Sequence, residues 1–219
     1  MSDKQLKHTC GLYLCVPARS NAAEDPRLLQ ILDTRQVSCL LITPSSDEVI
    51  NPQNAYALSE AAKSRDITAM IKDEPQLART LKADGVHLSW HDDIMDRYKE
   101  AREIVDSRVV VGAEAGRSRH TAMCLGEVGA DYVAFAIPPH VKDVKKAQSR
   151  QLELVRWWSK IFEVPCVAFN AADQERMRLL VALGADFIAT DIPAGKSAQD
   201  IDDWFDACIK TLCLEDNDE

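Results

Sequence analysis

A pattern that begins with aspartate and continues into a short apolar run occurs three times in this chain. It occupies residues 84–88, 131–135 and 186–190, and each copy follows a helical pattern that ends on small residues. The copies begin 47 and 55 residues apart. One strand with its following helix takes about 25 to 30 residues in barrels of roughly 250 residues with eight such units. The spacing therefore fits two units per copy, and the copies are predicted to be every second strand of a repeating βα architecture.

Eight short apolar runs alternate with eight helical patterns along the chain. The expected strands are 12–16, 37–42, 67–71, 86–88, 108–111, 132–137, 164–169 and 187–190. The expected helices are 27–35, 53–65, 74–82, 93–106, 118–128, 145–162, 173–183 and 198–214. The strand runs are continuous rather than alternating in polarity, which is typical of parallel strands covered on both faces.

This alternation predicts a closed (β/α)8 TIM barrel. The barrel is expected to form one domain over residues 1–219, with residues 1–9 and 215–219 as frayed ends. An open, doubly wound sheet is the alternative, but its usual Gly-x-Gly-x-x-Gly fingerprint does not follow the first strand.

Composition excludes several classes of partner. The net charge of −9 disfavours binding to nucleic acid or to an anionic membrane. No run of about 18 apolar residues is present, so no transmembrane helix is expected, and residues 1–8 lack an apolar signal core. The seven cysteines include no Cys-x-x-Cys pair, which favours a reducing, cytoplasmic location over a disulfide framework or a zinc site. Adjacent Trp157 and Trp158 either pack on the barrel or form a subunit contact, so a homo-oligomer is possible.

The loops after the strands carry the chemistry in such barrels. Asp73 and Asp92 follow the third and fourth expected strands, so their carboxylates are expected to share one cation. Two hard carboxylates suit Mg²⁺, which takes the rest of its ligands from water and phosphate oxygens. The alternative for Asp73 is a role as the N-cap of the next helix.

Gly195 and Lys196 precede the last helix, where backbone N–H groups and the helix dipole are able to bind a phosphate. The segment is not a P-loop, and surface charge is the alternative reading of Lys196. Arg117, Arg119 and His120 form a similar, weaker anion candidate at the start of the fifth helix. The two histidines at positions 87 and 91 lack partners at metal-ligand spacing, so no zinc site is predicted.

Several segments carry a resemblance to a known family. Residues 83–88 followed by Asp92 are the most distinctive of them; the others are 12–14 with Pro17, 111–112, 129–133, 164–165, 167–168 and 184–186. In this order they resemble the thiamine phosphate synthase family, which includes the related thiazole tautomerases. The resemblance spans about residues 12 to 192.

The resemblance implies an enzyme that joins a hydroxymethylpyrimidine pyrophosphate to a thiazole phosphate and releases pyrophosphate. It also implies Mg²⁺ held by two aspartates, which fall on Asp73 and Asp92. The partners would then be small phosphorylated heterocycles.

The chain departs from the family pattern at the phosphate-binding motifs. The Gln-x-Arg-x-Lys after the second strand is replaced by residues 41–45, Thr-x-Thr-Lys after the sixth by 138–140, and Gly-Gly-Ile after the seventh by 170–172. Lys72 stands in place of an asparagine and Glu114 in place of a serine. Lys72 and Lys142 are the nearest candidates to restore positive charge, and Glu114 works against phosphate binding unless it is turned away or paired, for example with Arg117 or Arg119. The alternative function is a catalytically impaired binding or regulatory protein, or an enzyme for another phosphorylated heterocycle.

Overall fold

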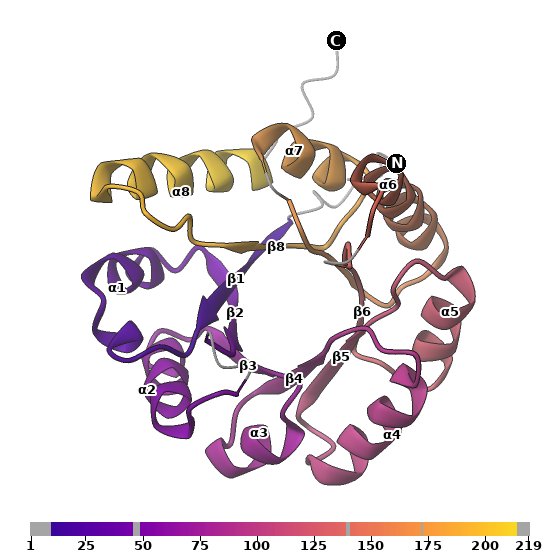
Figure 1. Cartoon of the computed structure of the whole chain (residues 1–219), viewed down its shortest axis with the longest axis horizontal. Helices are drawn as coiled ribbons and strands as arrows, with labels where there is room; N and C mark the ends of the chain where they lie inside the picture. The colour runs from indigo at the N-terminus through magenta and orange to yellow at the C-terminus, as the bar shows by residue number, and fades with distance from the viewer. Residues whose placement is uncertain (1–9, 46–48, 139–140, 172, 214–219) are drawn as a thin grey trace, which may run out of the picture.

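The computed structural model describes residues 10–45, 49–138, 141–171 and 173–213. Eight parallel strands close into one barrel in the order β1 to β8 (Figure 1), so the predicted (β/α)8 fold is confirmed. The strands are β1 Gly11–Pro17, β2 Val37–Thr43, β3 Thr68–Lys72, β4 Gly85–Leu88, β5 Val110–Glu114, β6 Tyr132–Phe135, β7 Cys166–Ala168 and β8 Phe187–Asp191. The predicted frayed ends lie outside the described residues.

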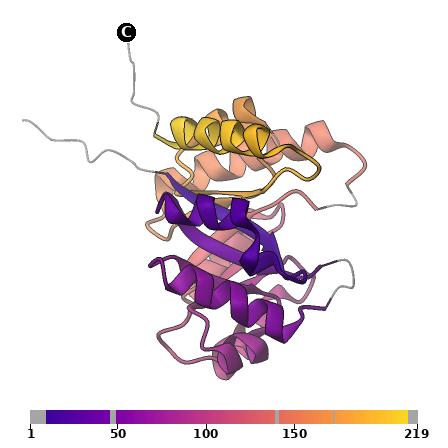
Figure 2. The same ribbon diagram turned by 90° about the vertical axis from the view of Figure 1, so that its left-hand side faces the viewer.

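A helix follows every strand and covers the outside of the barrel (Figures 1 and 2). The helices are α1 Pro26–Asp33, α2 Pro52–Lys63, α3 Pro75–Leu81, α4 Ile94–Ile104, α5 Arg119–Glu127, α6 Val144–Ile161, α7 Gln174–Ala182 and α8 Ala198–Leu212, with a short 3-10 helix, η1 Ala22–Glu24, before α1. Most of the apolar core lies between strands and helices. A second cluster fills the barrel itself and contains Tyr13, Cys15, Cys39, Leu41, Met70, Tyr132, Ala134, Val167 and Ala189. No helix among the described residues is both long and apolar enough to span a membrane.

The three repeated aspartates have one common structural role. Asp84 accepts a hydrogen bond from the backbone N–H of Ala69 on β3 at 2.8 Å. Asp131 and Asp186 accept equivalent bonds from β5 and β7, from Val111 at 2.7 Å and Cys166 at 2.8 Å. Each aspartate therefore ties the start of an even-numbered strand to the strand before it. A carboxylate that accepts a backbone N–H satisfies a donor that burial would otherwise leave costly.

The fifth strand lies later in the chain than predicted. It covers Val110–Glu114 rather than 108–111, so residues 112–114 pair with β6 and do not belong to a loop. A Cβ added at Gly112 would come within 2.0 Å of Cζ of Tyr132. The glycine is therefore required by the tyrosine ring that crosses it inside the barrel. The sixth strand is shorter than predicted and ends at Phe135.

Candidate functional site

A chain of polar side chains runs through the barrel beneath its C-terminal mouth. The hydroxyls of Tyr13 and Tyr132 are 2.9 Å apart, and the Tyr132 hydroxyl lies 2.8 Å from Nδ1 of His87. Nε2 of His87 lies 3.3 Å from Oε1 of Glu114. A carboxylate accepts, so in its neutral form His87 would donate from Nε2 to Glu114 and accept at Nδ1 from the Tyr132 hydroxyl. Burial raises the pKa of both tyrosines well above its usual value, which keeps them neutral.

Glu114 is engaged by hydrogen bonds, as pairing, one of the two alternatives, required. Its partners, however, are not Arg117 or Arg119. Oε1 contacts His87, and Oε2 accepts the backbone N–H of Trp90 at 3.1 Å. The Arg119 guanidinium instead lies 4.9 Å from the ring centre of Trp157. The predicted arginine pairing is wrong because barrel closure brings β4 and its loop closer to Glu114 than the residues that follow it in sequence.

Asp73 does not cap the following helix; Glu74 occupies the N-cap position of α3. Asp73 has φ +58, and its Oδ1 accepts from the backbone N–H of Ser89 at 2.8 Å. The same oxygen lies 3.2 Å from Nη2 of Arg97 on α4. The left-handed backbone turns the carboxylate from the end of β3 toward the β4–α4 loop. The capping alternative is therefore wrong, and Asp73 belongs to the mouth of the barrel.

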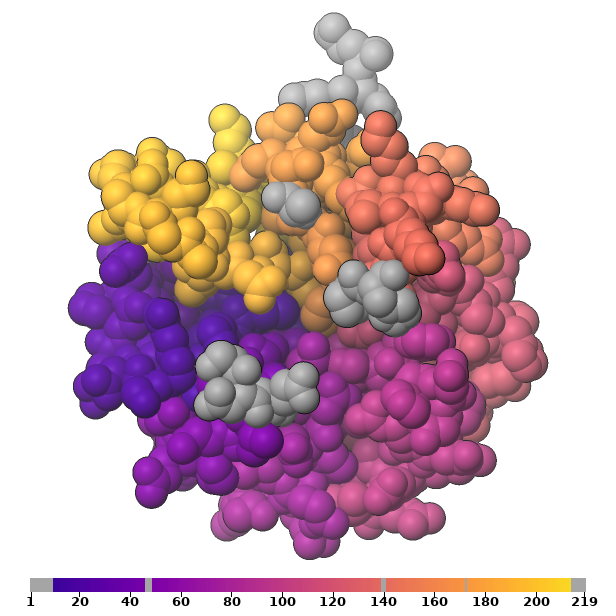
Figure 3. Space-filling model, viewed as in Figure 1, coloured from indigo at the N-terminus to yellow at the C-terminus, as the bar shows by residue number. Residues whose placement is uncertain are grey.

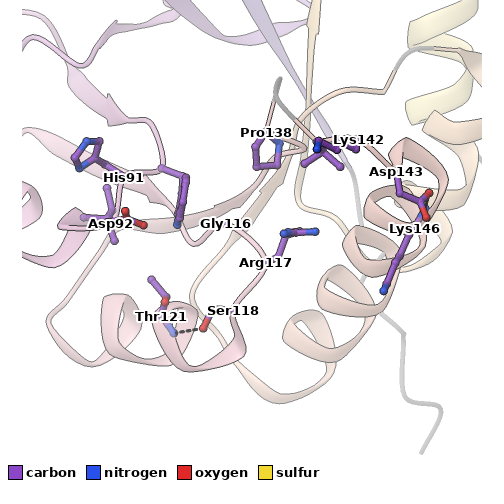
Figure 4. Close-up of a pocket in the computed structure, with 13 residues that line it drawn as sticks. His91, Asp92, Gly116, Arg117, Ser118, Thr121, Pro138, Lys142, Asp143 and Lys146 are labelled. Carbon is purple, nitrogen blue, oxygen red and sulfur yellow. Dashed lines mark hydrogen bonds between the residues drawn. The ribbon is translucent and has the colours of Figure 1, made fainter.

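Asp92 lines a pocket of about 760 Å³ at this end of the molecule. The pocket lies between the loops after β4, β5 and β6 (Figure 4). Its polar walls are His91, Asp92, Arg117, Ser118, Thr121, Lys142, Asp143 and Lys146. Asp92 and Lys142, two of the predicted site residues, are thus brought together. Described residues from the N-terminal (indigo) to the C-terminal (yellow) part of the chain form the face shown in Figure 3.

The residues present are compatible with Mg²⁺ although they form no complete cage. No group of three or more His, Cys, Asp or Glu side chains with metal-binding geometry occurs among the described residues. Mg²⁺ is usually bound by one or two carboxylates, with waters and substrate phosphates completing its shell. Asp92 is exposed, and Asp73 uses Oδ1 for Ser89 and Arg97, so oxygens of the required kind face the mouth. Sharing of one cation by this pair stays a prediction.

Lys72 lies at the end of β3 beside a second carboxylate. It is two residues beyond Met70, which fills the barrel interior, so its half-buried side chain points toward the same central axis. Asp191 is exposed at the end of β8, yet desolvation by the surrounding mouth raises its pKa, and the Lys72 ammonium opposes that rise. Lys72 is therefore a cation of the central mouth, separate from the pocket that Asp92 lines.

A family model described as thiamine monophosphate synthase matches residues 12–191. The chain belongs to this family. A thiamine-phosphate synthase of Rhodospirillum centenum is 38% identical over 199 residues, which cover 86% of this chain and 93% of that protein. The thiamine-phosphate synthase of Erythrobacter litoralis is 41% identical over 137 residues, 62% of this chain and 63% of the relative. The resemblance carried by residues 83–92 is confirmed.

Solved structures agree with this assignment at the level of the fold. A thiamine phosphate pyrophosphorylase from Pyrococcus furiosus aligns with a TM-score of 0.72, covering 94% of this chain and 98% of the other at 18% identity. A protein named GGGPS from Thermoplasma volcanium aligns with a TM-score of 0.68, covering 94% of this chain and 92% of the other at 11% identity. At such identities the likeness shows only that the barrel is shared.

One departure from the family pattern has a clear structural compensation. Asn170 stands where the family has glycine, and its backbone adopts φ +60, a left-handed conformation that asparagine tolerates better than most residues. Its Oδ1 accepts the backbone N–H of Ile137 at 2.7 Å. The side chain therefore ties the loop after β7 to the loop after β6. Ala172, Pro139 and His140 lie outside the described residues.

The last helix already carries an anion at its N-terminus. Ser197 and Asp200 form a reciprocal capping box, in which Oδ2 of Asp200 lies 3.2 Å from the Ser197 backbone nitrogen. The Ser197 hydrogen bonds lower the pKa of Asp200. Gly195, with φ +71, and Lys196 are exposed in the preceding loop. A phosphate at this helix would compete with Asp200, so the binding role of Gly195 and Lys196 stays a prediction.

Replacing Asp191 by asparagine is expected to stabilise the protein at neutral pH. The folded state raises the Asp191 pKa above 3.8, so ionisation costs more in the folded than in the unfolded chain. Below pH 3.8 both states are protonated and the two proteins should have equal stability. Urea unfolding of both proteins at pH 7 and pH 3 measures the difference. A less stable variant at pH 7 would show that attraction to Lys72 outweighs the cost of burial.

Proposed function

We propose that this chain is a thiamine-phosphate synthase, which joins a hydroxymethylpyrimidine pyrophosphate to a thiazole phosphate and releases pyrophosphate. The observation that carries the proposal is the 38% identity to a relative of that name across 86% of the chain. The Asp92 pocket supports it, because it combines a carboxylate with basic side chains at the end where barrel enzymes carry their sites.

Asp73 and Asp92 are the residues that would hold Mg²⁺. When bound there, the ion supplies neutralisation of the negative charge that develops on the departing pyrophosphate. Lys72 and Lys142 add positive charge from the central mouth and from the loop after β6. Gly195 and Lys196 are assigned the smaller part of holding the second phosphate, beside the occupied N-terminus of α8.

The reacting groups are expected to meet above the buried Tyr13–Tyr132–His87–Glu114 chain. These residues fill the barrel beneath the mouth, so they exclude water from below. Glu114 fixes the tautomer of His87, since its carboxylate accepts the Nε2 proton. His87 and Glu114 thereby form a fixed surface at the base of the mouth, against which a heterocyclic substrate would pack. Neither residue is required to move a proton in this scheme.

The alternative is a family member without catalysis that binds the same heterocycles or regulates a partner. Its motivation was the loss of the family's phosphate motifs. The name shared by relatives 37 to 41% identical favours the enzyme. The three cations of the Asp92 pocket also provide positive charge that the loss of those motifs would otherwise remove.

A cytoplasmic location and a homo-oligomer complete the proposal. All seven cysteines are free thiols, as suits a reducing compartment. Trp158 is fully buried against the barrel, whereas Trp157 is partly exposed beside it. Of these two tryptophans, Trp157 is therefore the one available for a subunit contact.

The purified chain is expected to form thiamine phosphate from hydroxymethylpyrimidine pyrophosphate and thiazole phosphate. Formation should require Mg²⁺, stop with excess EDTA and resume when Mg²⁺ is restored, because the leaving group needs its charge neutralised. Product is measured by chromatography and released pyrophosphate by a coupled assay. Absence of product at saturating substrates, with binding of both substrates intact, would favour the non-catalytic alternative.

A further inference from the structure

Three cations converge on the Asp92 pocket from two different loops. Arg117 reaches it from the β5–α5 loop, and Lys142 and Lys146 reach it from the loop after β6 and the first turn of α6 (Figure 4). None of the three forms an ion pair with another described residue. The chain as a whole is acidic, with a net charge of −9, so a cluster of cations without ion-pair partners makes this pocket locally basic.

The pocket also contains two carboxylates, and one of them is already engaged. Oδ1 of Asp143 accepts the backbone N–H of Lys146 at 2.9 Å and caps the N-terminus of α6. Asp92 is exposed on the opposite wall. The pocket therefore presents three cations and one unengaged carboxylate, which suits a multiply charged anion that carries a divalent cation.

The loop that carries Arg117 is held in place by contacts on both sides. Gly116 has φ +60 and is buried under Trp90; a Cβ at this position would come within 2.5 Å of the indole. The Trp90 backbone is in turn held by Glu114. From the other side, Nε and Nη2 of Arg150 each donate a hydrogen bond to the Arg117 carbonyl oxygen at 3.4 Å. Arg117 therefore projects from a fixed backbone, which reduces the entropy lost when it binds a ligand.

We propose that Arg117, Lys142 and Lys146 grip the pyrophosphate end of the pyrimidine substrate, and that this pocket replaces the basic residues missing after β2. The proposal rests on the proposed function and deepens it. At the usual position after β2, Leu41 fills the barrel interior and Thr43 and Ser45 carry no charge. Positive charge for the leaving group has thus moved from one side of the mouth, β2, to the other, β5 and β6.

The geometry favours the pyrophosphate over the single phosphate of the thiazole. A pyrophosphate carries more negative charge and more acceptor oxygens, which matches three cations better than a monophosphate does. Asp92, one of the two residues proposed to hold Mg²⁺, lines the same wall. Ser118 and the N-terminus of α5 add a favourable dipole at the edge of the pocket.

Titration calorimetry with inorganic pyrophosphate and Mg²⁺ tests the proposal directly. Arg117→Gln and Lys146→Met are each expected to weaken binding at least tenfold. Lys145→Met is the matched control, because Lys145 is the exposed neighbour of Lys146 on α6 and does not line the pocket. It should bind within about twofold of the unaltered chain. Equal affinities for all four proteins would overturn the proposal.

Steady-state kinetics separates this inference from the function on which it rests. Arg117→Gln should raise the KM for the pyrimidine pyrophosphate at least tenfold and leave the KM for the thiazole phosphate within twofold. If the unaltered chain makes no thiamine phosphate but loses pyrophosphate affinity on Arg117→Gln, the proposed function fails and the pocket stands. If it is active and both KM values are unchanged by Arg117→Gln, the pocket assignment fails and the function stands.

Discussion

Replacing Trp158 by alanine is expected to lower the free energy of unfolding by about 3 to 5 kcal/mol, the usual cost of removing a large buried aromatic side chain. The indole is fully buried, stacks on Phe162 at 4.0 Å between ring centres, and meets Phe135 of β6 edge-on. Its N–H donates to the Val164 carbonyl at 2.7 Å. Since domains have about 5 to 15 kcal/mol of total stability, the variant should be close to unfolding. Urea unfolding followed by far-UV circular dichroism measures the change.

Trp157→Ala is the matched control. Trp157 precedes Trp158 on α6 but is partly exposed, where it lies under the Arg119 guanidinium. Trp157 packs at the edge of the core, so its loss should cost on the order of 1 kcal/mol, the usual effect of a point substitution. Trp158→Phe keeps a buried aromatic ring but removes part of the indole together with its N–H bond to Val164, so a loss of about 1 to 3 kcal/mol is expected. Equal losses for the two alanine variants would contradict the assignment of Trp158 as the anchor of α6.

The barrel could be predicted because its determinants are local or periodic in sequence. Each repeated aspartate stands directly before a strand, and each accepts a backbone N–H from the preceding strand of the barrel. The repetition was therefore visible as a pattern at twice the length of a βα unit. The hydrogen bonds of these aspartates could not be predicted in the same way, because each partner residue lies 15 to 20 residues earlier in the chain.

The fifth strand shows where a local pattern misleads. The apolar run predicts a strand over residues 108–111, which puts residues 112–114 in the loop that follows it. In the folded chain the Tyr132 ring occupies the space over Gly112, and His87 and Trp90 bind Glu114. These partners come from β6, β4 and the β4–α4 loop. Only closure of the barrel brings them together.

The sequence predicts the carboxylates of the candidate site but only some of its cationic side chains. Asp92 follows a distinctive strand, so its position at the mouth could be inferred from sequence. The sequence marks Arg117 only as a weak anion candidate and places Lys146 within the expected helix 145–162, with no role of its own. They share one pocket because α5 and α6 begin on neighbouring loops, which is a property of packing rather than of sequence spacing.

Replacing Asp92 by alanine is expected to reduce kcat/KM for thiamine phosphate formation by about 100- to 1,000-fold. The proposed role of the carboxylate is to hold Mg²⁺ against the departing pyrophosphate, and loss of one group that stabilises transition-state charge typically costs about 3 to 4 kcal/mol. The folded structure should be unaffected, because Asp92 is exposed and lies in the loop before α4. Initial rates over a range of Mg²⁺ concentrations, together with thermal unfolding, measure both effects. The apparent Mg²⁺ requirement should rise in the variant.

Asp93→Ala provides the control for charge and position. Asp93 is the next residue, is also exposed, and makes no side-chain capping hydrogen bond to α4, although its carboxylate lies 2.5 Å from Nδ1 of His91. It does not line the pocket, so its removal should change kcat/KM by less than about threefold, as expected of surface substitutions. Asp73→Asn keeps an acceptor for the Ser89 N–H and tests the second proposed ligand without releasing the β4–α4 loop. Equal losses for Asp92→Ala and Asp93→Ala would mean that the loop's total charge, rather than one metal-binding carboxylate, supports the reaction.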